Sequence, residues 1–130
     1  PAREIETAAL GNDDVAISVC GEVFSATEVY SYESKYLNSA SKTVIPADIS
    51  PELSDEIRAY AEKIYRALCC RGLSRVDFFL CDDGRICLNE INTLPGFTSI
   101  SMFPKLFGQV GIPYSELIDR LIEYAEERMR

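Results

Sequence analysis

Two hydrophobic runs that flank an acidic turn form the clearest pattern in this chain. The first run ends at Cys81, the second starts at Ile86, and Asp82-Asp83-Gly84-Arg85 separates them. An Asp-Gly pair between hydrophobic runs is typical of a β-hairpin, because type I′ turns need positive φ angles that glycine adopts readily. The pattern predicts an antiparallel hairpin that starts near Arg75 and ends near Asn92.

Apolar segments in the first 30 residues predict three more strands. They cover residues 4–10, 15–20 and 23–30, with turn signals at Gly11-Asn12-Asp13-Asp14 and at Gly21-Glu22 between them. Short strands joined by such turns favour an antiparallel meander.

The remaining segments predict a long loop and three helices. Residues 31–49 are polar and aperiodic, and a loop of this length in a compact domain is more often functional than incidental. Ser50-Pro51 is a helix-start signature, a serine cap before proline at the first helical position, and this helix is expected to end at Gly72. Further helices are expected from near Ser101 to Gly111 and from about Pro113 to the C-terminus. The fold class is therefore α+β, an antiparallel sheet with flanking helices. The apolar stripes expected to face the core are Leu53, Ile57, Tyr60, Ala61, Ile64 and Leu68 in the first helix, and Tyr114, Leu117, Ile118, Leu121, Ile122 and Ala125 in the last.

The turn of the hairpin sets which residues face each other. If Asp83-Gly84 is a two-residue loop, Asp77 lies directly opposite Glu90, and Asn92 shares their face because side chains alternate with period two. A change of one residue in the loop would place Asn89 opposite Asp77 instead. The predicted pairs are Asp82–Arg85, Phe79–Leu88, Asp77–Glu90 and Arg75–Asn92.

Opposed carboxylates on neighbouring strands predict a cation site. Asp77 and Glu90 would repel each other at this distance unless a cation lies between them. Magnesium prefers one or two carboxylates together with phosphate oxygens of a substrate. The spacing alone leaves a second interpretation open, in which both acids simply face water.

The segment after the hairpin predicts an anion pocket. Pro95-Gly96 is a strong turn signal, and Thr98, Ser99 and Ser101 precede the start of the short helix. Amides and hydroxyls at a helix start suit a carboxylate or a phosphate. The alternative is a turn followed by a serine cap with no ligand.

Three motifs together resemble a known family. Residues 89–106, NEINTLPGFTSISMFPKL, with SRVDFFL at 74–80, resemble the C-terminal part of D-alanine–D-alanine ligases, members of the ATP-grasp superfamily. Residues 30–37, YSYESKYL, resemble the ω-loop of that family, and residues 3–12, REIETAALGN, resemble the strand after its adenine-binding hinge. The motifs occur in the expected order and span nearly the whole chain.

The resemblance implies a role for each matching residue. Asp77, Glu90 and Asn92 match magnesium ligands, with Glu90 bridging two ions, and Mn²⁺ is an alternative metal. Arg75 matches the arginine that meets negative charge on the transferred phosphate and on the tetrahedral intermediate. The nucleotide residues are Lys35 at the γ-phosphate, Glu4 at the ribose and Phe79 near the adenine. The residues at the amino-acid substrates are Tyr36, which helps to close the site, Gly96, whose amide holds the oxyanion, and Ser101 and Met102, which hold the carboxylate of the second D-alanine.

The reaction that the resemblance implies is ATP-dependent ligation of two D-alanine molecules through D-alanyl phosphate, a cytoplasmic step of peptidoglycan synthesis. Related ligases that accept D-lactate carry histidine where Tyr36 stands, and this chain has no histidine. Tyr36 therefore favours an amine as the attacking group. D-serine as the second substrate stays open, as does a non-catalytic fragment that serves binding or assembly.

Composition narrows the classes of partner. A net charge of −8 argues against nucleic acid, whose phosphates would be repelled. Five cysteines without a C-x-x-C motif predict reduced thiols of a cytoplasmic protein. No apolar run reaches membrane-spanning length, so no membrane partner is expected. The expected partners are ATP, D-alanine and, for the full-length enzyme, a second copy in a homodimer.

The resemblance also implies that much of the enzyme lies outside this sequence. Residues 1–130 match the C-terminal portion of the ATP-grasp catalytic domain, and the N-terminal domain and the first part of the ATP-grasp domain have no counterpart here. We therefore expect these residues alone to bind magnesium–nucleotide weakly and to catalyse no ligation.

Overall fold

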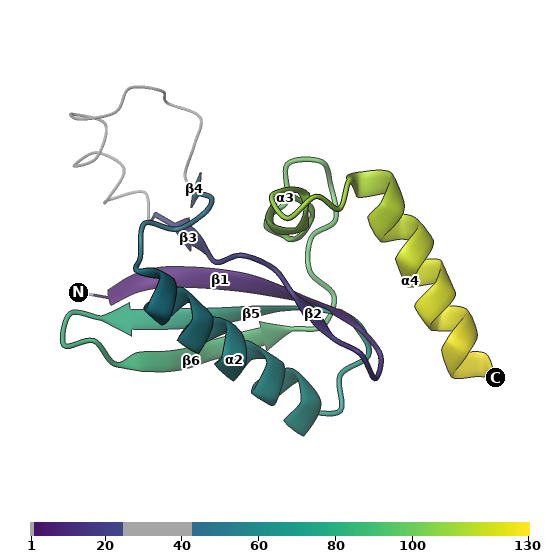
Figure 1. The fold of residues 1–130 in the computed structure, drawn as a ribbon, viewed down its shortest axis with the longest axis horizontal. Coiled ribbons are helices and arrows are strands. Elements are labelled where there is room, and N and C mark those ends of the chain that lie inside the picture. The colour runs from purple at the N-terminus through teal and green to yellow at the C-terminus, as the bar shows by residue number, and fades with distance from the viewer. Residues whose placement is uncertain (1, 25–42) are drawn as a thin grey trace.

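A six-stranded antiparallel sheet forms the centre of the computed structural model, which describes residues 2–24 and 43–130. The strands follow the order β4-β3-β1-β5-β6, and β2 also pairs with β1. Figure 1 shows α2 lying across the sheet, with α3 and α4 grouped at the end remote from the N-terminus. The elements are β1 (Ala2–Gly11), β2 (Ala16–Ile17), β3 (Gly21–Val23), β4 (Thr43–Val44), α2 (Pro51–Ala67), β5 (Gly72–Cys81), β6 (Ile86–Asn92), α3 (Met102–Gly108) and α4 (Tyr114–Met129). The α+β fold class predicted from the sequence is confirmed.

One face of the sheet is closed by α2. Ser50 caps this helix by accepting a hydrogen bond from the amide of Leu53 at 3.2 Å, as the Ser-Pro signature predicted. Ile57 and Ala61 of α2 are fully buried against Phe78 and other apolar side chains of the strands. The hydroxyl of Tyr65 donates a 2.7 Å hydrogen bond to the carbonyl of Gly11, which ties the end of α2 to the sheet.

The other face is only partly covered. Phe103, Leu106 and Phe107 of α3 pack with Leu117 of α4 over Ala8 and its apolar neighbours. This second cluster covers the end of β1 that leads into Gly11 and the start of β5. The opposite end of the same face, beside the start of β1 and the hairpin tip, carries polar side chains instead.

The predicted meander is wrong over residues 16–23, and residues 25–30 of its third predicted strand lie outside the described residues. Both β2 and β3 pair with the same edge of β1. Residues 16–23 therefore form one interrupted strand beside β1, and not two successive strands that pair with each other. Gly21 lies within a strand and not in a turn. A Cβ atom at this position would lie 2.7 Å from the Cε of Met102 and 2.9 Å from the Cδ2 of Leu106. Glycine is present because α3 packs directly on the backbone there, which a turn prediction from local sequence does not detect.

Two predicted helix features also differ from the structure. The first helix ends at Ala67, before Gly72, and Cys69 adopts the positive φ of 54° that usually falls to glycine. Ile118 and Ile122 of α4 are exposed, since only one side of this helix meets the core. The long loop predicted at 31–49 is wrong at residues 43–44, which form β4, and residues 31–42 lie outside the described residues.

All five cysteines lie in the described part of the chain and are free thiols, which agrees with the absence of a disulfide framework predicted from their spacing. In the same described part, no helix is long and apolar enough to span a membrane.

Candidate functional site

The hairpin of β5 and β6 brings the predicted residues together through two compensating irregularities. Its tip is a three-residue loop, in which the amide of Cys81 donates to the carbonyl of Arg85 and Gly84 has a φ of +83°. The predicted two-residue loop and the Asp82–Arg85 pair are therefore wrong. Phe79 faces Cys87 and not Leu88.

A β-bulge then restores the register. Phe78 pairs with Leu88, whereas the preceding residue Asp77 pairs with Glu90, so Asn89 is an extra residue on β6. Beyond the bulge, the predicted pairs Asp77–Glu90 and Arg75–Asn92 are present.

The uncovered part of the sheet carries a row of three carboxylates. On β1, Glu6 lies opposite Asp77, which lies opposite Glu90 on β6. Directly opposed residues share a face, so all three side chains belong to the face that α3 covers only at its far end. Glu4 and Phe79 are opposed in the next position towards the hairpin tip. The predicted metal and nucleotide residues of the described chain thus share one surface.

Arg75 lies at the centre of this surface. Its guanidinium donates two hydrogen bonds of 2.8 Å to Asp77, one to each carboxylate oxygen. Its Nε also lies 3.2 Å from an oxygen of Glu6. The hydrogen bonds to Asp77 are the main cause that raises the pKa of Arg75 above its ordinary value. This bidentate geometry is the strongest arginine–carboxylate arrangement available.

Glu6 is the least satisfied acid of the row. Its side chain is 13% exposed, and its Oε2 atom is buried without a well-aligned hydrogen bond. The pKa of Glu6 is raised from 4.5 to about 7, chiefly by burial and then by the nearby charge of Asp77, against the opposing effect of Arg75. The row therefore carries more negative charge than its single arginine balances, and a bound cation would relieve it.

Aromatic packing positions the loop after β6. The ring of Phe97 lies 5.6 Å from that of Phe103 and 5.2 Å from that of Tyr114, between ring centroids. The hydroxyl of Tyr114 donates to the carbonyl of Phe97. At the start of the loop, Asn92 accepts a 3.1 Å hydrogen bond from the amide of Leu94 through its side-chain oxygen. The loop is fixed at both ends.

The residues of the predicted anion pocket lie close together in this loop. The hydroxyl of Ser101 accepts a hydrogen bond from the amide of Thr98 at 3.0 Å and lies 2.8 Å from its hydroxyl. A Cβ atom on Gly96 would lie 3.1 Å from the same oxygen of Ser101, so glycine keeps this approach open. Met102 begins α3 and packs its side chain into the core, which leaves its backbone amide at the helix start.

The chemistry of the predicted metal ligands suits a hard cation such as magnesium, because all of them offer oxygen atoms. Asp77, Glu90 and Asn92 offer oxygen ligands on one face, and Glu90 is exposed to solvent. Among the described residues, no three or more acidic, cysteine or histidine side chains converge into a ready metal cluster. Arg75 holds both oxygens of Asp77.

Two predicted residues, Lys35 and Tyr36, lie outside the described residues. One acid, Glu6, was missed by the sequence prediction. Period two along the strand already indicated it, because Glu4 and Glu6 must share a face.

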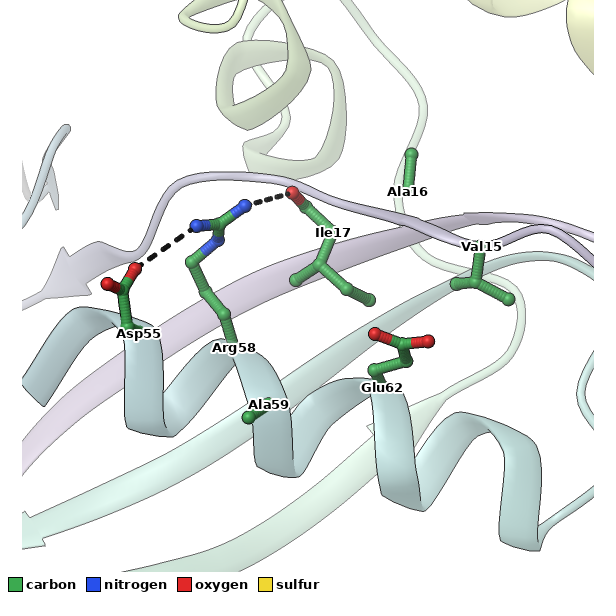
Figure 2. A pocket seen from close by; sticks show the side chains of 7 residues that line it. All are labelled: Val15, Ala16, Ile17, Asp55, Arg58, Ala59 and Glu62. Carbon is green, nitrogen blue, oxygen red and sulfur yellow. Dashed lines mark hydrogen bonds and ion pairs between the residues drawn. The ribbon is translucent and has the colours of Figure 1, made fainter.

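A hollow of about 510 Å³ lies elsewhere, between α2 and β2, and none of the predicted site residues lines it. Figure 2 shows that Arg58 in this hollow is engaged by Asp55 and by the carbonyl of Ile17. The hollow is separate from the carboxylate row.

Comparison with known proteins decides the family. The family described as D-ala D-ala ligase C-terminus matches residues 1–123. The chain belongs to this family. It is 52% identical over 130 residues to the D-alanine–D-alanine ligase of Caldicellulosiruptor bescii, covering 99% of this chain and 36% of the relative. It is 51% identical over 127 residues to D-alanine–D-alanine ligase A of Escherichia coli K12, covering 97% of this chain and 35% of the relative.

Solved structures of D-alanine–D-alanine ligases and a related enzyme share the fold. The ligase of Coxiella burnetii matches with a TM-score of 0.82 and 36% identity, over 98% of this chain and 32% of that one. The VanG D-Ala:D-Ser ligase of Enterococcus faecalis matches with a TM-score of 0.81 and 37% identity, over 95% of this chain and 36% of that one. The chain thus spans about a third of the length of these relatives.

Proposed function

We propose that this chain forms the C-terminal portion of the ATP-grasp domain of an enzyme that joins two D-alanine molecules at the expense of ATP. The observation that carries the proposal is the register of the hairpin, which sets Asp77 opposite Glu90 on an open face. A carboxylate is a poor electrophile, so it is first phosphorylated by ATP, and the amine of the second substrate then displaces phosphate. Such chemistry needs positioning and charge neutralisation more than a nucleophile from the protein.

Asp77, Glu90 and Asn92 would hold one or two magnesium ions, with Mn²⁺ as a substitute. Magnesium bound there supplies positive charge against the phosphate oxygens. Arg75 offers paired donors to the transferred phosphate, which suits a planar guanidinium better than an ammonium group. Glu4 binds the ribose hydroxyls, and Phe79 contributes an apolar surface for the adenine.

The loop after β6 serves the amino-acid substrates. Gly96 contributes its amide to the oxyanion of the tetrahedral intermediate. Ser101 and the amide of Met102 hold the carboxylate of the second D-alanine. Lys35 reaches the γ-phosphate, and Tyr36 closes over the second substrate. These two assignments rest on the motif at residues 30–37.

The described face is one wall of the active site in this proposal. The relatives are about three times as long as the chain, and we assign the second wall to segments that they carry beyond the matched region. The whole enzyme would be a cytoplasmic homodimer that supplies D-alanyl-D-alanine to peptidoglycan synthesis. Residues 1–130 alone are expected to form no dipeptide.

The test is an assay of ADP and dipeptide formation by a full-length enzyme that contains this sequence. We expect ADP release that depends on D-alanine and on magnesium, and its loss by orders of magnitude in Asp77→Asn. Glu62→Gln is the control, because it removes the same charge from a solvent-exposed ion pair on α2. Equal activity of Asp77→Asn and the parent enzyme would refute the assignment.

D-serine is the second candidate for the attacking amine, since the VanG D-Ala:D-Ser ligase is among the similar structures. Kinetics with D-alanine, D-serine and D-lactate in competition would decide. We expect a higher kcat/KM for D-alanine as the attacking substrate, and no depsipeptide from D-lactate. Preferential formation of D-alanyl-D-serine would establish the alternative.

A further inference from the structure

Arg75 and the proposed metal compete for the same acid. Both oxygens of Asp77 accept hydrogen bonds of 2.8 Å from the guanidinium. A carboxylate held in this way can coordinate a cation well only after it gives up at least one of these hydrogen bonds. The released guanidinium is still largely buried, with a side chain only 20% exposed, so it needs another acceptor nearby.

Glu6 is placed to be that acceptor. It lies directly opposite Asp77 on the neighbouring strand, and its Oε2 lies 3.2 Å from the Nε of Arg75. The same oxygen is buried and lacks an aligned donor. Glu6 is thus close enough to bind the guanidinium but is not fully engaged by it.

We propose that Glu6 is a positioning residue that accepts the hydrogen bonds of Arg75 when Asp77 coordinates magnesium. This exchange frees Asp77 for the cation and keeps the guanidinium at the phosphate side of the row. The inference rests on the proposed function, because it assumes that Asp77 binds the metal. In this inference Glu6 acts by binding the guanidinium of Arg75, and it does not coordinate the metal itself.

The alternative role, a further magnesium ligand, is less consistent with the geometry. Strand β5 lies between the strands that carry Glu6 and Glu90. The Oε2 atom of Glu6 already lies beside the Nε of Arg75. A ligand role would nevertheless be visible in the experiments below.

The first experiment needs no catalysis and no metal. Thermal melting of the full-length enzyme is measured at pH 8 with a chelator for the parent, Glu6→Gln, Asp77→Asn and the double variant. In the parent, Glu6→Gln should raise the melting temperature, because it removes a buried and poorly paired charge. In the Asp77→Asn background, Arg75 has only Glu6, so the same substitution should lower it.

The reversal of sign distinguishes exchange from simple repulsion. If Glu6 only repelled Asp77, the stabilising effect of Glu6→Gln would shrink to zero in the double variant and would not reverse. An effect of equal size and sign in both backgrounds would overturn the inference. The Glu62→Gln control should behave identically in both.

The second experiment measures the dependence on magnesium. The half-saturating concentration of Mg²⁺ for ADP formation should rise about tenfold in Glu6→Gln, as is typical when an outer partner of a metal ligand is lost. Binding of Mn²⁺ to the enzyme without ATP, followed by electron paramagnetic resonance, should weaken by a similar factor with an unchanged number of ions.

The outcomes separate the inference from the proposed function. A parent enzyme without D-alanine-dependent ADP release would refute the function, while the melting experiment would still report on the exchange. An active parent with an unchanged magnesium dependence in Glu6→Gln would overturn the inference alone. Loss of one bound Mn²⁺ in that variant would make Glu6 a ligand and also overturn it.

Discussion

The two faces of the central sheet are built from alternating residues of the same strands, yet they differ in almost every physical property. Val76 and Phe78 point towards α2 and are at most 2% exposed, within a closed apolar cluster. Asp77, between them, points the other way into a row of acids with one arginine. Period two lets one strand serve stability on one side and the proposed chemistry on the other. The two properties should therefore respond to different substitutions, and four predictions test this separation.

The largest effect on stability is expected from Phe78→Ala on the closed face. Removing a buried aromatic side chain costs about 3–5 kcal/mol, because a cavity remains among Ile57, Ala61 and their neighbours. The melting temperature of a full-length enzyme should fall sharply, whereas kcat per folded molecule well below this temperature should stay near the parent value. Loss of kcat at unchanged stability would contradict the separation of the two faces.

The largest effect on activity is expected from Glu90→Gln on the open face. The rate of ADP formation should fall about 100-fold or more, because an anionic ligand is replaced by a neutral one. Stability should change by about 0.5 kcal/mol or less, since the side chain is exposed. Asp82→Asn at the tip of the same hairpin is the matched control for charge, and a similar fall there would rule out a specific role for Glu90.

A smaller effect is expected where the two regions meet, at Gly21. The Cβ of Gly21→Ala would crowd Met102 and Leu106, and overpacking of this kind costs about 1–3 kcal/mol. Because α3 begins at the proposed carboxylate pocket, the KM for the second D-alanine should rise, by up to about tenfold. Gly108→Ala in the same helix is the control, since an added methyl group meets nothing within 4 Å. Equal KM values for both variants would show that the packing of α3 does not position the pocket.

The fourth effect is the pH dependence that Glu6 confers on stability in the absence of metal. Its pKa is raised from 4.5 to about 7, so the folded state favours the neutral acid. The stabilising contribution of that form is complete below about pH 4.5 and is lost as the pH rises through about 7. Melting curves with a chelator should therefore show the gain from Glu6→Gln growing between these values and then levelling off. A gain that is the same at pH 4 and pH 8 would contradict the assigned cause.

Sequence signals that span only a few residues correctly predicted the elements that such short segments determine. The Ser50-Pro51 start of α2 and the hairpin at Asp83-Gly84 were predicted correctly, because caps and turns are encoded within a few residues. Gly21 was taken for a turn because its reason lies in α3, about 80 positions away in the sequence. The exposed Ile118 and Ile122 were taken for core because amphipathic spacing does not tell how much of a helix the rest of the molecule covers.

The pairing of the strands at the proposed site was predicted better than the turn that leads to it. The pairs Asp77–Glu90 and Arg75–Asn92 were correct although the assumed loop was one residue too short, because the bulge at Asn89 cancelled that error. No pattern in the sequence announces such a bulge. The ion pair between Arg75 and Asp77 was also not predicted, since it depends on the side-chain conformations that burial selects.

The bulge at Asn89 separates the hairpin into two parts that tolerate insertion differently. Between the bulge and the tip, the strands pair one residue out of step with the pairs beyond the bulge, where Glu90 and Asn92 lie. Because Asn89 is the extra residue of the bulge, its deletion alone should remove the bulge and still leave Glu90 opposite Asp77 and Asn92 opposite Arg75. Across homologous enzymes, the length at position 89 should therefore vary independently of the length of the tip.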